Sequence, residues 1–318
     1  MNRPLILPLL LLSLALFACD PQEDAKVIAT VGMLGDVAAT VAGDCAEVVT
    51  MMGPGVDPHL YQASASDVQL LQNAALIFYV GYNLEGQIGE VLETLSETRP
   101  VVAVAEEAVP ESETLSADDK AADPHLWMDV SLWTKTVDVI AGELAALNEA
   151  CAASISERAE RLKTELEALH AWIALSVASI PETQRVLITA HDAFAYYGRA
   201  YDIEVEGIQG ISTASEASLA DIRETANLVS ERGVPALFVE SSVNPRTIQA
   251  VQAAARDRGA EVGLGAELFS DAVGESGTAE GTYIGMLKSN TESIVTGLGG
   301  AVAPWPPELD AWAEQWKQ

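Results

Sequence analysis

The chain has 318 residues, of which 49% are hydrophobic, and 17 Lys and Arg against 47 Asp and Glu give it a formal net charge of −30. This length suits two domains of ordinary size, and the apolar share excludes a wholly disordered chain. A surface this acidic repels a phosphate backbone, which argues against nucleic acid as a partner. The charge is typical of a solvated acidic surface and says nothing about the fold.

The first 19 residues are predicted to be an export signal. A short positive start precedes residues 5–17, an almost wholly apolar stretch that is too short to span a bilayer but suits a signal-peptide core. The stretch ends at Cys19 in a sequence that resembles a bacterial lipoprotein cleavage box, so we expect Cys19 to carry a lipid. Ordinary cleavage stays open because Phe17 is bulky for such a box. Residues 20–25 then form a polar tether.

No later apolar stretch approaches the length that a membrane helix needs. The sequence therefore predicts an exported protein, in the periplasm or on the outer face of the cytoplasmic membrane, held by a lipid anchor. Apart from Cys19, the chain has two cysteines, Cys45 and Cys151. In an oxidising compartment an even pair suits a disulfide, and two free buried thiols are an equally open alternative.

Strand and helix patterns alternate in the first part of the chain. Short apolar runs predict strands at 26–31, 47–52, 76–80 and 101–105. Amphipathic stretches predict helices at 34–42, 64–73, 84–96 and 131–147. The strand at 76–80 is apolar throughout, which is typical of a sheet covered on both faces. Residues 111–122 are predicted to be a polar loop.

A long helix is predicted in the middle of the chain. Residues 152–180 contain no Gly and no Pro, their apolar side chains recur at spacings of three and four, and Pro181 ends the pattern. A helix of about 28 residues would be roughly 42 Å long. Its place between two halves of alternating strands and helices indicates a rigid strut.

The second half repeats the alternation. It predicts strands at 185–189, 236–239 and 261–264, and helices at 194–201, 218–232, 245–258 and 282–298. We therefore expect an α/β fold of two lobes, each with a mostly parallel sheet flanked by helices, joined by one long helix. The N-terminal lobe is predicted at 26–150, the linking helix at 151–181 and the C-terminal lobe at 182–303. Residues 304–318 carry three tryptophans and are predicted to pack back on the body as a helix.

Only four histidines occur in the chain, and two of them share one context. His59 and His125 are each the third residue of the tetrapeptide Asp-Pro-His-Leu. Proline fixes its own φ and biases the preceding Asp away from helix, so each histidine is presented from a stiff loop. A rare residue repeated inside a rigid tetrapeptide favours a ligand over two turn histidines without one.

The other two histidines differ from each other. His191 is predicted just past a buried strand, where residues line ligand crevices in open α/β sheets, although a hydrogen-bonded loop histidine fits equally well. His170 lies off the apolar stripe of the long helix and is predicted to be solvated. Asp271 opens a glycine-rich loop in the second half, where an Asp taken singly is more often a turn residue or cap.

Together these side chains predict a metal site. Three imidazoles and one carboxylate suit a borderline divalent transition ion, so we predict one ion bound by His59, His125, His191 and Asp271. Two ligands would come from each half, which places the metal in the cleft between them. Glu240 and Glu216 are candidates to hold these ligands in place, although a solvated or capping role is the commoner one for such residues.

At these residues the sequence resembles the metal-binding proteins of bacterial ABC importers for zinc, manganese and iron. The similar segments are GPGVDPHLY at 53–61, DPHLWMD at 123–129, TAHDAF at 189–194, GIQGISTASE at 207–216 and ELFSDA at 267–272. The resemblance covers about residues 26–299. It implies two α/β lobes joined by a long helix, an ABC permease as partner, and metal held between the lobes by the same three histidines and Asp271.

Two departures from that family bear on the metal. Dedicated zinc carriers often insert a histidine-rich loop, whereas residues 111–122 contain no histidine. Dedicated manganese carriers tend to have Glu as third ligand, whereas this chain has His191. Imidazole suits zinc better than manganese, so the sequence favours zinc, with manganese or iron(II) as alternatives.

Three functions compete. A monomeric binding protein, which we expect, needs a closed site and no catalysis. A zinc hydrolase needs three protein ligands, an open position and a general base, and the sequence has neither a His-Glu-x-x-His helix nor a recognisable nucleophile elbow. A surface adhesin on the same fold is compatible with the tether, but no residue pattern demands it.

Overall fold

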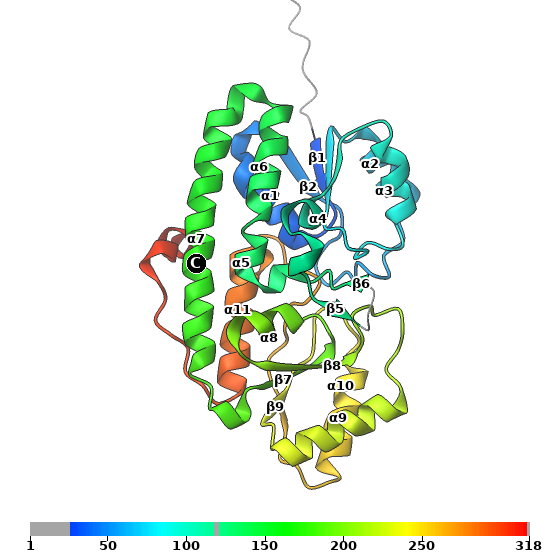
Figure 1. Cartoon of the computed structure of the whole chain (residues 1–318), viewed down its shortest axis with the longest axis vertical. Coiled ribbons are helices and arrows are strands. Elements are labelled where there is room, and N and C mark those ends of the chain that lie inside the picture. The colour runs from blue at the N-terminus through cyan, green and yellow to red at the C-terminus, as the bar shows by residue number, and fades with distance from the viewer. Residues whose placement is uncertain (1–25, 118–120, 317–318) are drawn as a thin grey trace, which may run out of the picture.

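A computed structural model describes residues 26–117 and 121–316. The predicted export signal, Cys19, the tether and part of the polar loop lie outside the described residues. Figure 1 shows two lobes, one above the other, joined along one side by the long helix α7 (Ala152–Ala178). The predicted fold class is confirmed. Within the described part of the chain, no helix combines the length and the apolar character needed to cross a membrane.

The N-terminal lobe is built on a four-stranded parallel sheet with strand order β2-β1-β3-β4. The strands are β1 (Lys26–Ala29), β2 (Glu47–Thr50), β3 (Leu76–Tyr79) and β4 (Val101–Ala103). In the centre of the sheet, Ile28 pairs with Val49 on one side and Ile77 on the other. The central strands are apolar and buried because helices cover both faces. These helices are α1 (Gly32–Ala42), α2 (Ala65–Asn73), α3 (Gly89–Ser96), α4 (Val104–Ala108), α5 (Val130–Trp133) and α6 (Thr136–Leu147).

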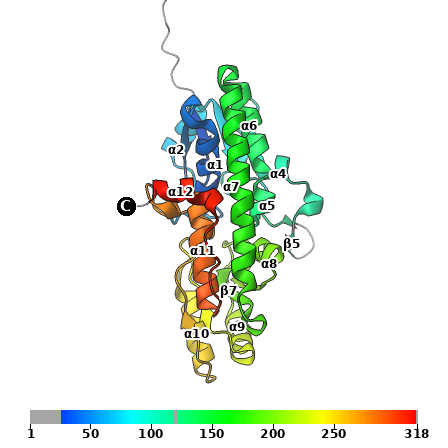
Figure 2. The same cartoon turned by 90° about the vertical axis from the view of Figure 1, so that its left-hand side faces the viewer.

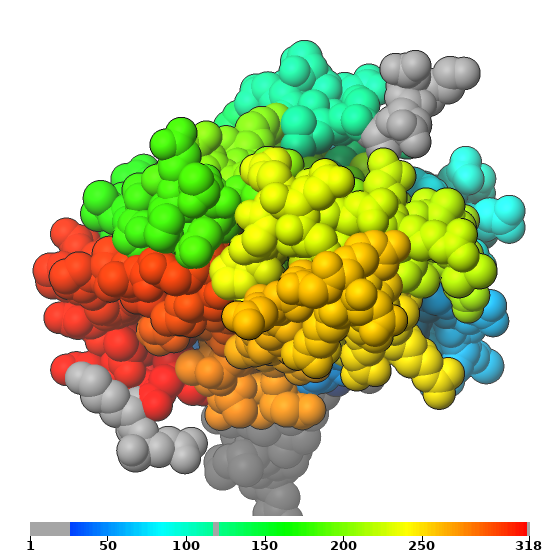
Figure 3. Space-filling view, turned by 90° about the horizontal axis from the view of Figure 1, so that it is seen from below, coloured from blue at the N-terminus to red at the C-terminus, as the bar shows by residue number. Residues whose placement is uncertain are grey.

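The C-terminal lobe has four short strands, all paired in parallel. The strand β7 (Val186–His191) pairs with β8 (Glu204–Gln209), and β9 (Ala236–Leu237) pairs with β10 (Gly263–Leu264). The Phe238 amide donates to the Ile188 carbonyl at 3.1 Å, which joins β9 to β7. The helices of this lobe are α8 (Ala195–Tyr201), α9 (Leu219–Arg232), α10 (Arg246–Arg256) and α11 (Tyr283–Gly297). Seen from below, α9 and α10 lie side by side across the end of the lobe (Figure 3).

The strut α7 contacts both lobes along its 27 residues. Its apolar stripe is buried against α6 in the upper lobe and α11 in the lower lobe, and Figure 2 shows it running past both. At its upper end, Cys151 forms a disulfide with Cys45, with a Cα–Cα distance of 6.0 Å. About two turns further on, the Arg158 guanidinium donates to the Val41 carbonyl at 2.8 Å. These contacts fix the upper end of the strut to the N-terminal lobe.

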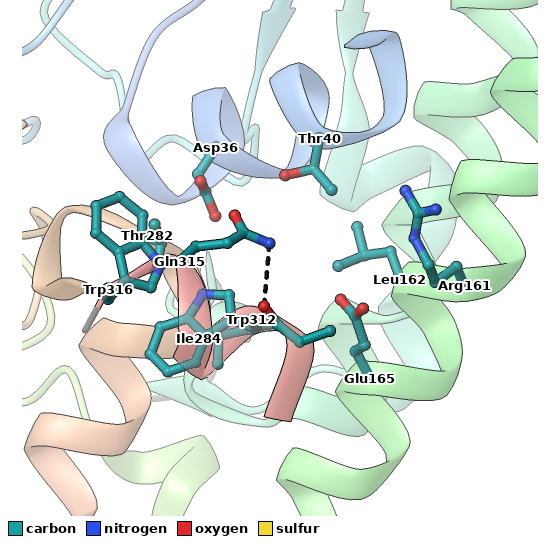
Figure 4. A pocket seen from close by; sticks show the side chains of 11 residues that line it. Asp36, Thr40, Arg161, Leu162, Glu165, Thr282, Ile284, Trp312, Gln315 and Trp316 are labelled. Atoms are coloured by element: carbon teal, nitrogen blue, oxygen red, sulfur yellow. Dashed lines mark hydrogen bonds between the residues drawn. The ribbon is translucent and has the colours of Figure 1, made fainter. Parts of the chain in front are cut away.

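The C-terminal tail, described for residues 304–316, packs on the strut α7. The Trp172 indole of α7 donates to the Ala303 carbonyl at 2.9 Å, and its ring lies 5.0 Å from that of Trp305. The last helix of the described residues is α12 (Asp310–Gln315). A cavity of about 430 Å³ lies between α1, α7 and α12. Figure 4 shows Asp36 of α1 and Trp312 and Gln315 of α12 among the side chains that line it. None of the four predicted metal ligands lines this cavity.

Several expected elements differ in extent. The helix expected at 84–96 begins only at Gly89, because residues 82–88 form turns, which Tyr82 and Asn83 open with positive φ angles of 49° and 62°. The strand expected at 101–105 ends at Ala103, and its last two residues begin α4. The helix expected at 131–147 is divided into α5 and α6 by a turn.

Three strands were not expected at all: β8, β5 and β6. The edge strand β8 carries charged residues at Glu204 and Glu206, so its apolar pattern is weak. The loop at 111–122 contains a small antiparallel pair of strands, β5 (Ser116–Ala117) and β6 (Ala121–Ala122). Strands β9 and β10 are shorter than expected, whereas β7 is longer and extends to His191.

Candidate metal centre

The two Asp-Pro-His-Leu tetrapeptides fold in the same way. In the first, the His59 amide donates to Asp57 Oδ1 at 2.9 Å, and in the second the His125 amide donates to Asp123 Oδ1 at 2.9 Å. Each Asp therefore closes a short turn over the amide of its histidine, as Asp side chains commonly do in loops. Both turns belong to the N-terminal lobe and direct their imidazoles toward the other lobe.

The C-terminal lobe supplies two side chains from the carboxyl edge of its sheet. His191 is the last residue of β7, rather than lying past the strand as expected. Its amide donates to Glu240 Oε1 at 2.9 Å, and Glu240 itself pairs with Leu268 in a parallel bridge. Asp271 follows this bridge by three residues. This is the edge at which open α/β sheets bind their ligands.

The four predicted ligands meet between the lobes. One donor atom from each of His59, His125, His191 and Asp271 lies within 4.8 Å of the others. His59 Nε2 is 3.3 Å from His125 Nε2, His125 Nε2 is 3.4 Å from Asp271 Oδ1, and His191 Nε2 is 3.1 Å from Asp271 Oδ2. Ligand bonds of about 2.0–2.1 Å in a tetrahedron give edges of roughly 3.3 Å. These three distances match such edges.

Two carboxylates hold the outer nitrogens of the imidazoles. His125 Nδ1 lies 2.7 Å from Asp123 Oδ1, and His191 Nδ1 lies 2.5 Å from Glu240 Oε2. A proton on each Nδ1 leaves the Nε2 lone pair directed at the centre of the cluster. Carboxylates in this position fix the tautomer and the orientation of metal-binding histidines and raise their basicity.

Burial and charge shift the pKa values of the cluster in different directions. Burial lowers the pKa of His59 to about 4. Burial also lowers the pKa of His125, but the carboxylates of Asp123 and Asp271 overcome it and raise the value to about 9. The pKa of His191 is raised in the same way, well above its usual range, by Asp271 and Glu240.

The pKa of Asp271 is shifted in the opposite direction from those of His125 and His191. Burial raises its pKa, but His191 and His125 outweigh burial and hold it well below its usual range. Without an ion, the cluster therefore carries protons on His125 and His191 beside an ionised Asp271. A divalent cation can take the place of those protons.

The structure also places three further residues that the sequence singled out. Glu240, for which a solvated or capping role was the commoner expectation, is 2% exposed and contacts His191. Glu216 lies exposed in the loop between β8 and α9, which agrees with the commoner expectation of a solvated residue. His170 is half-buried, with Nδ1 3.1 Å from the Tyr201 hydroxyl and away from the cluster.

Two side chains close to the cluster were not singled out from the sequence. The Trp127 ring lies 5.2 Å from the His125 ring, and its indole donates to the Ser270 carbonyl of the other lobe at 2.8 Å. Thr213 donates from Oγ1 to Asp57 Oδ2 at 2.6 Å. Both residues lie within segments that carry the family resemblance, but their contacts depend on how the two lobes meet.

The fold and the cluster define a class of protein: two α/β lobes on a helical strut, with a buried set of three histidines and one aspartate between them. Residues 27–297 match the family described as zinc-uptake complex component A, periplasmic, and the chain belongs to this family.

Individual relatives agree with this assignment. The chain is 44% identical over 281 residues to the zinc-binding protein TroA of Treponema pallidum, covering 88% of this chain and 91% of the relative. It is 39% identical over 306 residues to the manganese-binding lipoprotein MntA of Bacillus subtilis, covering 94% of this chain and 100% of the relative. The solved structure of the periplasmic zinc-binding protein TroA superimposes with a TM-score of 0.85, over 86% of this chain and 99% of that one.

Proposed function

We propose that this protein is the substrate-binding component of an ABC importer for a divalent transition metal. It captures one ion between its lobes through His59, His125, His191 and Asp271 and delivers it to a membrane permease. The observation that carries the proposal is the convergence of these four donor atoms, two from each lobe, within 4.8 Å of one another. Family membership supports the same function.

Zinc is the favoured substrate, with manganese and iron(II) as alternatives. Three imidazole nitrogens and one carboxylate suit zinc by ligand softness and by the order of metal affinities. The relatives are named for different metals, zinc for TroA and manganese for MntA. The donor set of this chain supports zinc.

The geometry favours binding over hydrolysis. His59 is 6% exposed and the other three side chains are less exposed still, which leaves little room for a substrate beside an ion. The two carboxylates nearest to the ligands, Asp123 and Glu240, each contact a histidine and are occupied in holding it. A catalytic zinc site keeps an open position and a free general base. No contact in the described residues favours the adhesin alternative.

The remaining parts of the proposal concern place and assembly. We propose that the chain is exported, that Cys19 carries a lipid and that the protein acts as a monomer outside the cytoplasm. The apolar start of the chain and the lipoprotein names of relatives support the anchor.

Metal titration tests the proposed function. The full mature protein is freed of metal with a chelator and titrated with zinc and, separately, with manganese. We expect one ion per chain and tighter binding of zinc. His170→Ala is the matched control, because His170 contacts Tyr201 rather than the cluster. Stoichiometric binding that is equally strong without the three cluster histidines would contradict the proposal.

A further inference from the structure

The two Asp-Pro-His-Leu tetrapeptides differ in the second contact that the aspartate side chain makes. Asp123 accepts from both the amide and Nδ1 of its own His125 through Oδ1. Asp57 accepts from the His59 amide through Oδ1, but its Oδ2 accepts from Thr213 of the opposite lobe at 2.6 Å. The same local motif thus orients a ligand in one copy and reaches across the cleft in the other.

Thr213 lies in the loop that connects β8 to α9, residues 210–218. Most of this loop is exposed, whereas Thr213 itself is 8% exposed. The loop is held to its own lobe by the Gln209 side-chain amide, which donates to the Ser215 carbonyl at 3.2 Å. Figure 1 places this loop on the side of the molecule away from α7. The loop therefore meets the N-terminal lobe on the side opposite the strut.

The predicted ligand beside this contact is also the one most exposed to solvent. His59 is the most exposed of the four predicted ligands, at 6%, and the next residue, Leu60, is 49% exposed. Asp57 joins the His59 turn to Thr213, so the contact closes the cleft beside the ligand that lies nearest to solvent.

Close to the strut, the lobes are joined by buried contacts of a different kind. The Trp127 indole donates to the Ser270 carbonyl, and the Tyr283 hydroxyl donates to the Trp127 carbonyl at 2.7 Å. The Tyr283 amide also donates to Asp36 of α1 at 2.8 Å. With this side held by several contacts, a small opening of the cleft would break the Thr213 contact first.

We propose that Thr213 is a positioning residue that latches the cleft over the bound ion and slows its release. The inference rests on the proposed function and adds a kinetic role for a residue outside the ligand set. The hydroxyl acts through Asp57 and the His59 turn and does not touch the ion. Its loss should therefore change the rate of release much more than the rate of capture.

The test compares Thr213→Val, which keeps the shape of the side chain but removes the hydroxyl, with Thr213→Ser, which keeps the hydroxyl. Ser212→Ala is the matched control, because Ser212 lies in the same loop and its hydroxyl accepts from the Ala214 amide within that loop. Each full-length protein is loaded with zinc alone and mixed rapidly with an excess of chelator to follow release. Capture is followed separately with metal-free protein.

We expect Thr213→Val to release zinc about tenfold faster, the effect of losing one hydrogen bond to a charged group. Its capture rate should stay at the wild-type value, and Thr213→Ser and Ser212→Ala should release zinc at the wild-type rate. Release from Thr213→Val at the wild-type rate would overturn the latch. So would a lower unfolding temperature of its metal-free form without faster release, because that result assigns Thr213 a structural role only.

Failure of the latch and failure of the proposed function are distinguishable. A wild-type protein that binds no zinc overturns the proposed function and the latch together. Wild-type and Thr213→Val proteins that bind zinc and release it equally fast overturn the latch alone.

Discussion

Glu240 holds His191 at two points: Oε1 accepts from the backbone amide at 2.9 Å, and Oε2 lies 2.5 Å from Nδ1. One carboxylate thus fixes both the position of the residue and the plane of its ring. Both side chains are fully or almost fully buried, so no solvent competes for these contacts. The proposed ligand atom, Nε2, is left 3.1 Å from Asp271 Oδ2.

The first prediction concerns Glu240→Gln. Its amide oxygen can still accept from the His191 amide, but the amide nitrogen offers a donor to Nδ1 and so favours the wrong tautomer. We expect zinc affinity to fall by about 10- to 100-fold without loss of fold. Competition with a chromophoric chelator measures the affinity. Glu216→Gln is the control, because Glu216 is exposed, and an unchanged affinity for Glu240→Gln would show that His191 needs no orientation.

The second prediction is that zinc affinity falls with acid. The carboxylates of Asp123 and Asp271, acting against burial, raise the pKa of His125 to about 9, so this imidazole carries a proton at neutral pH that the ion must displace. His191 behaves likewise. Zinc affinity should therefore rise as the pH approaches the His125 pKa of about 9. It should fall by at least about tenfold for each pH unit below that pKa.

Titrations at several values of pH measure this dependence. Calorimetry in buffers of different ionisation enthalpy should also detect protons released on zinc binding near neutral pH. Zinc retention unchanged at a pH of about 4, or binding without proton release, would count against a site of three imidazoles.

The third prediction concerns the disulfide between Cys45 and Cys151, which closes a sequence separation of 106 residues. Replacing both cysteines with Ser should lower the free energy of unfolding by at most about 4 kcal/mol, because the cross-link restricts the unfolded chain. Metal affinity should not change, because the bond lies at the upper end of the strut. Modification of both cysteines by a thiol reagent in the unfolded, unreduced protein would refute the bond.

The fourth prediction is that the lobes move little on metal loading. The strut contains neither Gly nor Pro, and helices kink sharply only at identifiable defects. We expect the loops that carry His125 and Asp271, and the end of β7 at His191, to rearrange instead. Solution X-ray scattering should give the same radius of gyration for metal-free and zinc-loaded monomer. A clear decrease on adding zinc would show that the strut bends.

The sequence predicted the parts of the centre that depend on local patterns. The repeated tetrapeptide identified His59 and His125, and the end of a buried strand identified His191. The residues that hold these ligands depend on tertiary contacts that local patterns do not encode. Glu240 lies 49 residues from His191 and contacts it because β9 lies beside β7. Thr213 is 156 residues from Asp57, and only the meeting of the lobes brings them together.

The fold was likewise predictable only where the sequence carries a clear local pattern. The strut and the central strand β3 were predictable because their apolar residues recur with a clear period or run without interruption. The strand β8 was missed because an edge strand with two exposed or half-exposed glutamates lacks that signal. Its pairing with β7 brings Gln209 opposite His191 and places the loop that carries Thr213.

The most direct test of the central claim is elemental analysis combined with zinc titration of the wild-type protein and His59→Ala. His59 brings one of the four donor atoms and, with a pKa lowered to about 4 by burial, offers a neutral imidazole at neutral pH. We expect one zinc ion per wild-type chain. The zinc affinity of His59→Ala should be lower by orders of magnitude, and that of His170→Ala should equal the wild-type affinity. A His59→Ala protein that titrates zinc as the wild type does would contradict it.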